Sequence, residues 1–501
     1  KDEMLQQAMD IAATINPTMA GQLTFTAEDI HLPAYGQIRD QMVAVSKILF
    51  HKGIYSMKLI DGQFRFGPES YPYNEPTSSI PGTVYQNPSN EDFETYQNGT
   101  PQVFGPITDE YGSFISAMAP VNNPVTGEVI MLIGIDFPTE EYLLALKKAK
   151  RIPHIIFLII LLLFLALMLN DLLRRSRTGY HTANKYRNTE TAIVGLSFLL
   201  LAFVVTLRTI SDEKNTIGQN FHSHALMKNN AVLNELTNIH ANLEILGRFI
   251  TDQELLLRDE FEHFGNYLLG LTTAEAYAWI PKLPAGQREL SDHDQLIDNR
   301  MENGNPAFNQ QKSGVQASQE LHYFPVHFMT RNKKFPFPEE FDISTIPEFS
   351  ELISSSEKSG LIGSVKYVIE NEGISEQYII SLNPVYRDPD PSMVHGKNAK
   401  PGSLIGFCAV AVNPNHTLYA VLSRQKTDMN MLIAELYDLM AHDTISRLAA
   451  FPPVYAAKGS RLLLTGANTN RVFQKVTPVF VFGNAFAIVT SASDEFHAAH
   501  P

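Results

Sequence analysis

Few residues in this sequence have the types and spacing that chemistry on a substrate requires. The GxGxxG, P-loop, HExxH and GxSxG motifs are absent, so phosphate cradles and hydrolytic nucleophiles of these kinds are not expected. His442 and Asp443 form a His-acidic pair, but Ile445 and Arg447 stand where a phospho-accepting histidine would be followed by a basic residue and a proline. We therefore predict that this chain is not an enzyme and uses no cofactor.

Cysteine content and charge exclude further classes of site. Cys408 is the only cysteine, which rules out an intramolecular disulfide and any CxxC metal or redox motif. Its neighbours Phe407 and Ala409 favour a small core residue at this position. The net charge of −14, from 39 basic and 53 acidic residues, argues against a nucleic-acid partner, because such proteins carry a clustered positive face.

Two apolar runs divide the chain of 501 residues, which is long enough for about three folded units of ~150 residues. Residues 155–169 contain no polar side chain, and with their flanks they reach the ~20 residues that cross ~30 Å of hydrocarbon. Residues 191–207 form a shorter second run, for which a buried core helix is the alternative. We predict a transmembrane helical hairpin over residues 151–210.

The charges beside these runs leave the orientation nearly tied. The connecting loop holds five basic residues between 174 and 187, which favours a cytoplasmic loop. Four more basic residues lie between 147 and 151 on the opposite side, with Arg208 and Lys214 beyond the second run. Charge alone therefore does not orient the hairpin.

The first soluble region, residues 1–150, has the pattern of a small antiparallel sheet between helices. Residues 3–14 show helical spacing of apolar positions. Asp61 and Gly62 lie between two alternating segments and predict a β-hairpin, because both residue types accept positive φ. Two further strands follow, and Pro138 then opens a helix that leads toward the membrane.

Three motifs gather at the end of this region. They are a G-P-x-x-D-x-x-G turn (residues 105–112), a Ser-Ala-x-x-Pro-Val strand and a Gly-Ile-Asp strand end (residues 134–136). Together they resemble the Cache family of extracytoplasmic PAS-like sensor domains, over about residues 50–147. The resemblance implies a ligand cleft between the sheet and its covering loops, with five candidate contacts: Tyr55, Lys58, Arg65, Asp109 and Tyr111.

Each of these candidates has a structural alternative. Asp109 could cap a turn and Tyr111 could lie in the core. Lys58 and Arg65 could be solvated strand residues. Asp136 is expected to cap the following helix rather than to bind a ligand.

The second soluble region is expected to begin with a long signalling helix over residues 211–265. Apolar residues recur there near heptad spacing, but His240 interrupts the repeat. A helix lying against its own domain and a dimeric coiled coil therefore both remain open. Strands dominate residues 266–501, so an α+β sheet domain is expected.

A Trp-Ile-Pro motif (279–281), a Tyr-Phe-Pro-Val strand (323–326) and an Asn-Pro-Val-Tyr segment (383–386) follow one another in this region. In this order they resemble the CHASE sensor family, over about residues 270–420. The resemblance implies two PAS-like lobes behind the long helix, with the ligand in the membrane-distal lobe. By position, the pocket would involve seven residues: His322, Tyr323, Ser364, Tyr367, Asn383, Gly406 and Cys408.

One position departs from part of that family. Plant cytokinin receptors use an acidic residue two positions before the tyrosine matched by Tyr323, and this chain has Leu321 there. Cytokinin is therefore not the expected ligand. For His322, an ordinary strand histidine is the alternative.

These resemblances place the hairpin loop inside the cell and both large regions outside. The expected fold class is α+β, with PAS-like antiparallel sheet domains and long helices joined by the two-helix transmembrane hairpin. The expected function is that of the ligand-sensing part of a multi-pass receptor of the cell (inner) membrane, of the sensor histidine kinase or diguanylate cyclase type. Its expected partners are a small-molecule ligand, membrane lipid and a second copy in a homodimer.

Two alternatives remain, a membrane-anchored hydrolase and a non-catalytic scaffold. The chain opens with Lys1, and we expect it to be a fragment. The natural protein would then carry another span before Lys1 and one after Pro501, followed by the output domain.

Overall fold

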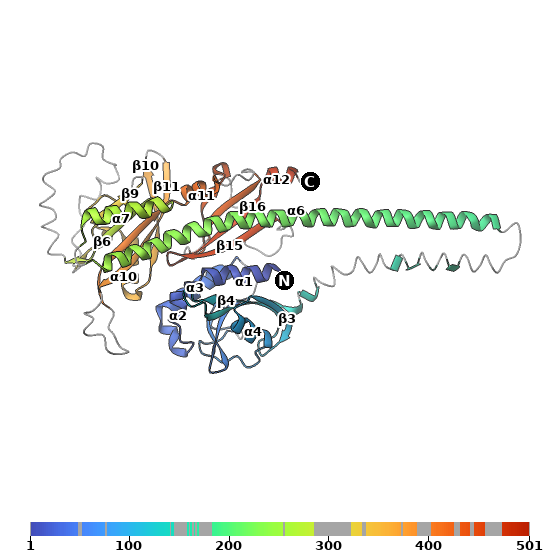
Figure 1. Ribbon diagram of the computed structural model, residues 1–501, viewed down its shortest axis with the longest axis horizontal. Helices are drawn as coiled ribbons and strands as arrows, with labels where there is room; N and C mark the ends of the chain where they lie inside the picture. Colours follow the sequence, from blue (N-terminus) through green and yellow to red (C-terminus); the bar gives the residue numbers. More distant parts are fainter. Residues whose placement is uncertain are drawn as a thin grey trace.

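The computed structural model describes most of the two soluble regions and the helix between them (Figure 1). The residues described are 2–48, 53–75, 78–140, 142–144, 183–253, 256–284, 322–332, 337–371, 374–387, 402–424, 431–440, 445–455 and 473–499, with seven more between 158 and 169.

Three antiparallel sheets make up the soluble parts, and all three follow one connectivity. The first sheet has the strand order β2-β1-β5-β4-β3, so its first strand lies between its second and its last. The second has the order β10-β11-β12-β6-β9, and the third β14-β13-β16-β15. Read from the other edge, the second sheet repeats the pattern of the first, and the third repeats it with one strand fewer. We name the corresponding units the first, second and third lobes.

The strands of the first lobe are β1 (Gly53–Ile60), β2 (Gln63–Glu69), β3 (Gln102–Thr108), β4 (Ser113–Asn122) and β5 (Val129–Pro138). Those of the second lobe are β6 (Ala276–Pro281), β9 (Phe328–Arg331), β10 (Gly363–Asn371), β11 (Ile374–Arg387) and β12 (Ser403–Val412), beside the short pair β7 (Leu283–Pro284) and β8 (His322–Tyr323). The third lobe has β13 (Leu432–Asp438), β14 (Ser446–Phe451), β15 (Gln474–Val481) and β16 (Asn484–Ala492).

The helices are α1 (Asp2–Thr14), α2 (Pro17–Gly21), α3 (Pro33–Ser46), α4 (Asn90–Asn98), α6 (Ala183–Thr251), α7 (Arg258–Leu271), α10 (Pro347–Ser359), α11 (Pro414–Leu422) and α12 (Asp494–Ala499). Three 3₁₀ turns, Ala27–His31, Ile343–Thr345 and Pro453–Tyr455, are also present. The mixed helix and antiparallel-sheet class predicted from the sequence is confirmed.

The predicted hairpin at Asp61 and Gly62 is confirmed by the pairing of β1 with β2. Ile60 faces Gln63 across the turn, and the two turn residues have φ values of 51° and 79°. Positive φ at both central positions is what matches a tight turn to the twist of two strands. The local sequence therefore fixes the register of the strand that carries Tyr55.

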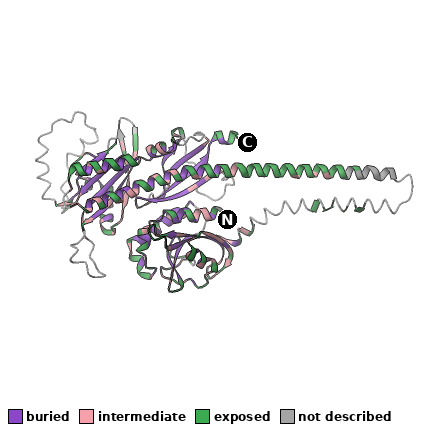
Figure 2. Cartoon of the chain, viewed as in Figure 1, coloured by how far each residue is buried: buried purple, intermediate pink, exposed green. Residues whose placement is uncertain are grey.

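The long helix α6 has two differently covered parts (Figure 2). From Val194 to Ile210 most of its large apolar side chains are exposed, and within the described residues it is the one helix long and apolar enough to cross a membrane, with a mean hydropathy of 2.0. From Val232 to Ile250 its apolar side chains are buried against the second and third sheets. Of the two arrangements left open by the sequence, the helix lies against its own chain.

Of the predicted transmembrane hairpin, the structure describes the second span, which lies in α6. The first predicted span lies largely outside the described residues, as do the loop residues 170–182 and the pair His442 and Asp443. The helix predicted over 211–265 also differs in its bounds, because α6 begins earlier, at Ala183, and ends at Thr251 before α7 starts.

The first lobe docks on the third lobe. Helices α1 and α3 cover one face of the first sheet, and the same core includes Phe480, Ala487 and Val489 of the third sheet. The other face of the third sheet packs on α6. The third sheet is thus enclosed between α6 and the first lobe, and the two soluble regions form one body (Figure 1).

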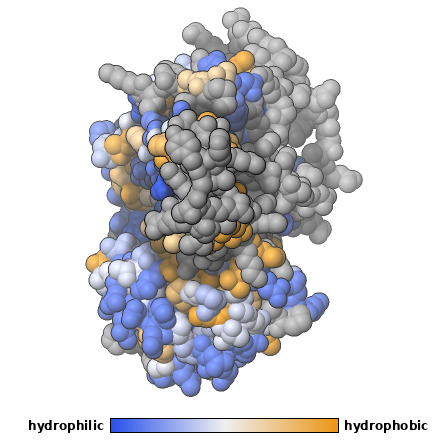
Figure 3. Space-filling view, turned by 90° about the vertical axis from the view of Figure 1, so that its right-hand side faces the viewer, coloured by the Kyte–Doolittle hydropathy of each residue, from blue (hydrophilic) through white to orange (hydrophobic). Residues whose placement is uncertain are grey.

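A buried ion pair and a hydrogen bond add polar contacts to this docking. Lys475 Nζ on β15 lies 3.0 Å from Asp10 Oδ2 on α1, and the two side chains are 5% and 8% exposed. Gln41 Nε2 on α3 donates to the carbonyl oxygen of Asn484 at 3.4 Å. In the view along the molecule of Figure 3, the outer edge of the first lobe, at the bottom, is mainly hydrophilic.

Candidate functional site

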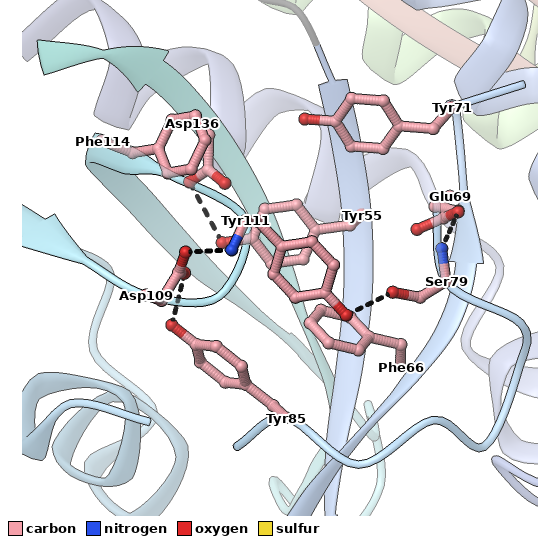
Figure 4. Close-up of a pocket in the computed structure, with 10 residues that line it drawn as sticks. All are labelled: Tyr55, Phe66, Glu69, Tyr71, Ser79, Tyr85, Asp109, Tyr111, Phe114 and Asp136. Carbon is pink, nitrogen blue, oxygen red and sulfur yellow. Dashed lines mark hydrogen bonds between the residues drawn. The ribbon is translucent and has the colours of Figure 1, made fainter. Parts of the chain in front are cut away.

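A small cavity lies in the first lobe, on the face of the sheet opposite α1 and α3. Its volume is about 30 Å³, enough for one or two water molecules. Figure 4 shows the side chains that surround it, which come from β1, β2, β4, β5 and the segments that connect strands. They are Tyr55, Phe66, Glu69, Tyr71, Ser79, Tyr85, Asp109, Tyr111, Phe114 and Asp136.

Close strand packing positions the floor of the cavity. Tyr55 on β1 pairs in register with Gly134 on β5. A Cβ on Gly134 would lie 2.3 Å from the Tyr55 ring, so only glycine lets this ring lie flat across the neighbouring strand. Phe66 on β2 meets Tyr55 edge to face, with ring centroids 5.9 Å apart.

Asp136 on β5 is a carboxylate of the cavity wall that bonds to two hydroxyl groups. It accepts hydrogen bonds from Ser116 Oγ at 2.7 Å and from Tyr55 Oη at 3.2 Å. Burial raises the pKa of Asp136 to about 7, although both hydroxyl donors act in the opposite direction. The prediction that Asp136 caps the following helix is wrong, because its side chain bonds across strands and lines the cavity.

Asp109 both caps a turn and lines the cavity, the two alternatives that the sequence left open. Its Oδ1 accepts the backbone N–H groups of Tyr111 and Gly112 at 2.8 and 3.0 Å, which closes the turn between β3 and β4. Its Oδ2 accepts the hydroxyl of Tyr85 at 2.9 Å inside the cavity wall. The turn therefore holds this carboxylate at a fixed place in the site.

Glu69 supplies a third carboxylate. Its Oε1 accepts from Ser78 Oγ and from the backbone N–H of Ser79, both at 2.7 Å. Burial raises the pKa of Glu69, while these hydrogen bonds and the charge of Arg39 lower it. The guanidinium of Arg39 itself lies 4.0 Å over the Tyr73 ring and donates to the Tyr71 carbonyl, and it does not line the cavity.

Rings form the rest of the wall. Phe66 has its ring centroid 5.6 Å from that of Tyr111 and 5.5 Å from that of Tyr85. Faces of aromatic rings carry partial negative charge and attract cations. Ten residues line the cavity, and none of them is Lys, Arg or His.

A hydrogen bond across the mouth closes the site. The hydroxyls of Tyr111 and Ser79 lie 2.8 Å apart. This contact ties the turn after β3 to the loop after β2, as the dashed line in Figure 4 shows. A ligand larger than the cavity therefore needs part of this wall to move.

Of the five predicted contacts in this lobe, Tyr55, Asp109 and Tyr111 line the cavity and two do not. Arg65 lies between the cavity-side residues Phe64 and Phe66, so its side chain leaves the sheet on the other face. Lys58 follows the buried Met57 in the same way, and its ammonium lies 5.8 Å from the Phe25 ring. Strand alternation therefore excludes both basic residues from the site.

Sequence reasoning missed seven lining residues. Phe66 could have been found from alternation, because it shares the cavity face with Phe64. Tyr71, Ser79 and Tyr85 lie on the irregular segment after β2, which carries no local signal for the site. The missed residues are Phe66, Glu69, Tyr71, Ser79, Tyr85, Phe114 and Asp136.

The residues predicted in the second lobe are not brought together. Tyr367 packs on Phe337 and Phe349, with ring centroids 5.0 and 6.0 Å away, in the core beside α10. Cys408 lies on the opposite face, toward α6, where burial raises the pKa of its thiol. Because successive strand residues point to opposite faces, one pocket cannot collect them.

The other residues predicted to bind a ligand in the second lobe lie in strand pairing, in packing contacts or on the surface. A Cβ on Gly406 would lie 2.4 Å from the Ile280 carbonyl oxygen, so this glycine permits close strand contact. Asn383 Nδ2 donates to the Leu243 carbonyl of α6 at 3.3 Å. Ser364 pairs with Ser381 in register, Tyr323 is buried on β8, and His322 is exposed.

Comparisons with known proteins give structural neighbours only. No family model and no curated protein match the chain. The ligand-binding domain of the Pseudomonas aeruginosa amino acid chemoreceptor PctC, solved with GABA, is 14% identical, with 54% of this chain and 98% of that one covered and a TM-score of 0.32.

Two further chemoreceptor domains give similar values. The domain of Campylobacter jejuni Tlp3, solved with L-norvaline, is 12% identical over 57% of this chain and 94% of its own, with a TM-score of 0.31. The domain of Pseudomonas fluorescens CtaA, solved with L-isoleucine, is 12% identical over 58% and 98%, also at 0.31. Scores this low assign no ligand to this chain, so function is argued from the cavity alone.

The cavity's donor set does not resemble a metal centre. Among the residues that the structure describes, no group of three His, Cys, Asp or Glu side chains is placed to hold a metal ion. Of the three carboxylates, Glu69 lies across the Tyr55 and Tyr111 rings from Asp109 and Asp136 (Figure 4).

Proposed function

We propose that the first lobe is the sensing lobe of a non-catalytic membrane receptor, and that its ligand is a small organic cation such as a protonated alkylamine. The observation that carries this proposal is the composition of the cavity. Three carboxylates and the faces of several rings converge on one small space, with no basic side chain among the lining residues. A carboxylate ligand would meet repulsion there, whereas an ammonium group finds opposite charge and ring faces.

Asp136 and Asp109 are the groups that would hold the ammonium. Asp136 is held only by the neutral hydroxyls of Ser116 and Tyr55, so no cation of the protein compensates its charge. An uncompensated buried carboxylate is costly, and a bound cation removes that cost. Tyr55, Phe66 and Tyr111 would surround the alkyl part.

The closed mouth supplies two states for signalling. Without ligand, the Tyr111–Ser79 hydrogen bond joins the two covering segments. A ligand larger than the cavity prefers the state in which they are apart, and it shifts the equilibrium by its differential affinity. The turn that carries Asp109 and Tyr111 leads into β4, which packs on α1, and α1 packs on the third lobe.

We also propose that both soluble regions lie on one side of the membrane, in a multi-pass protein of the inner membrane. The shared core and the buried Asp10–Lys475 pair support this, because two regions on opposite faces of a bilayer cannot pack on each other. A helix across the membrane before α6 would then complete the hairpin. A kinase or cyclase output, a homodimer and contact with lipid headgroups belong to the same proposal.

Thermal unfolding of the full chain in nanodiscs tests the ligand class. Butylammonium, butanol and butyrate would be compared as a cation, a neutral analogue and an anion. A ligand that binds the native state must raise its melting temperature with concentration, and we expect this for butylammonium alone. Asp136→Asn should lose the effect and Asp61→Asn, on the exposed β1–β2 turn, should keep it. Equal stabilisation by butanol or butyrate would reject the proposal.

A further inference from the structure

A second cavity lies where the three lobes meet. Its volume is about 170 Å³, and it is bounded by α3 of the first lobe, by α6, by the segment from Gly360 to Ile362 and β11 of the second lobe, and by β15 of the third. An apolar cavity of about 150 Å³ holds one benzene ring, so this space fits a single six-membered ring. It shares no lining residue with the cation cavity.

Several amide side chains line this junction cavity. Gln37 Oε1 is buried and has no hydrogen-bond partner in the described structure. Gln41 and Asn383 use their NH₂ groups on the carbonyls of Asn484 and Leu243, so their own oxygens remain as acceptors. A buried acceptor without a partner costs free energy, which a donor from a ligand would recover.

His240 adds a ring N–H donor to the lining. His240 Nδ1 accepts the backbone N–H of Phe482 at 3.2 Å, so the proton of the neutral ring is on Nε2. That Nε2 lies 3.8 Å from Glu244 Oε1, beyond hydrogen-bond distance, and remains available. Burial lowers the pKa of His240, which keeps the ring neutral.

Another part of the lining is apolar. It consists of Leu361, Ile362, Phe480 and Val481, of which Phe480 and Val481 belong to the buried core. A polyol would place hydroxyls against these side chains, whereas a flat ring would place only its faces there. The lining thus combines apolar side chains with amide acceptors, the imidazole donor of His240 and the carboxylate of Glu244.

We propose that the junction cavity is a second binding site, for a small uncharged planar heterocycle with an amide edge, of the size of a pyrimidine base or nicotinamide. N–H groups of the ligand's amide edge donate to the amide oxygens of Gln37 and its neighbours, and the carbonyl of that edge accepts from His240 Nε2. The ligand contacts all three lobes at once and therefore binds only while the first lobe is docked.

Titration calorimetry of the full chain in nanodiscs, with uracil and nicotinamide as probes, tests the site. Saturable binding of at least one probe is expected. 1,3-Dimethyluracil, which lacks both N–H donors, should bind at least tenfold more weakly than uracil, and this comparison needs no protein variant. Binding of neither probe at millimolar concentration, or equal binding of uracil and its dimethyl analogue, would overturn the proposal.

Variants locate the binding. Gln37→Met removes the buried carbonyl at nearly constant volume and should weaken probe binding about tenfold, while Gln63→Met, at an exposed strand end, should not. Asp136→Asn should leave probe binding unchanged, which separates this site from the cation cavity. Unchanged affinity in a folded Gln37→Met protein would also overturn the assignment.

Discussion

Asp136 is the residue whose protonation sets the chemistry of the cation cavity. Its pKa is about 7 because burial disfavours the charged form. Only the carboxylate form attracts an ammonium ion, and an alkylammonium, like the Lys side chain with its pKa of about 10.4, stays charged throughout this range. Binding of the cation is therefore expected to release a proton from Asp136 at or below neutral pH.

The affinity for butylammonium should accordingly rise about tenfold per pH unit below pH 7 and level off above it. Calorimetric titrations from pH 5 to pH 8.5 measure this dependence. In Asp136→Asn the remaining affinity should be weak and nearly independent of pH in this window. A wild-type affinity that stays flat between pH 5 and pH 8.5 would contradict the role of Asp136.

The free protein should show the reverse trend. Because the folded-state pKa of Asp136 lies above its unfolded value of about 4, the folded state holds more protons between these values. This group therefore lowers the free energy of unfolding as the pH rises from about 4 to about 7. The difference in stability between Asp136→Asn and wild type should grow in favour of the variant over that range.

Tyr111 is a second single residue for which we make a prediction, which concerns the access of a ligand to the cation cavity. Tyr111→Phe keeps the ring and removes the hydrogen bond to Ser79, which contributes about 1 kcal/mol, or roughly fivefold in the opening equilibrium. Stopped-flow mixing with butylammonium should show association about fivefold faster. Tyr267→Phe, at an exposed position on α7, should have no effect. Slower association in Tyr111→Phe would contradict a closed mouth.

The sequence predicted part of this site at the level of single residues. Tyr55, Asp109 and Tyr111 are correctly predicted by the cleft that the family resemblance implies. Lys58 and Arg65 are wrongly predicted because the face that a strand residue takes follows from strand pairing, which the resemblance does not specify. Asp136 was taken for a helix cap because a helix was expected directly after it, and only the pairing of β5 with β1 and β4 shows where its side chain lies.

At the scale of elements, α1 is the helix that joins the first lobe to the third lobe. It packs between the first sheet and the third sheet, and it carries the buried Asp10 that meets Lys475. Removing one member of a buried ion pair leaves an uncompensated charge and costs about 3–5 kcal/mol. The docking of the first lobe should therefore depend on both residues.

Asp10→Ala is expected to lower the free energy of unfolding by about 3–5 kcal/mol in urea. The double variant Asp10→Leu/Lys475→Met, which removes both charges, should recover most of this loss. Glu94→Ala, at an exposed position on α4, serves as the control. If the single variant and the double variant were both as stable as wild type, the interface between α1 and β15 would be contradicted.

Elements were predicted better than their contacts. Apolar spacing predicted the helix at residues 3–14, and the Asp-Gly pair predicted the hairpin of β1 and β2. Lys475, the ion-pair partner of Asp10, lies 465 residues farther along the sequence, and no local sequence pattern predicts a contact over that separation. The same holds for the second lobe, where Tyr367 was expected at a ligand but packs on Phe337 and Phe349.

At the scale of the whole molecule, the two soluble regions share one core. That core joins Ala8 and Ile11 of α1 to Phe480 and Ala487 of the third sheet. The sequence predicted about three folded units, but it gave no information on how they pack. Their packing arises from long-range apolar contacts, and it constrains the topology in the membrane.

Cysteine labelling in intact cells tests that constraint. In a Cys408→Ala background, Val125→Cys in the first lobe and Ser355→Cys in the second are both exposed positions. Both should react with a membrane-impermeant maleimide added outside. Labelling of one position and not the other would show that the regions lie on opposite sides, and the shared core would be contradicted.

The central claim is that the first lobe binds a small organic cation through Asp136 and its aromatic surroundings. Its most direct test is equilibrium binding of butylammonium and butanol, side by side, to wild type, Asp136→Asn and Asp61→Asn at pH 8. The account predicts saturable binding of the cation to wild type and Asp61→Asn, loss of at least tenfold in Asp136→Asn, and no saturable binding of butanol. Binding of the cation that is unaffected by Asp136→Asn, or no binding to wild type, would contradict it.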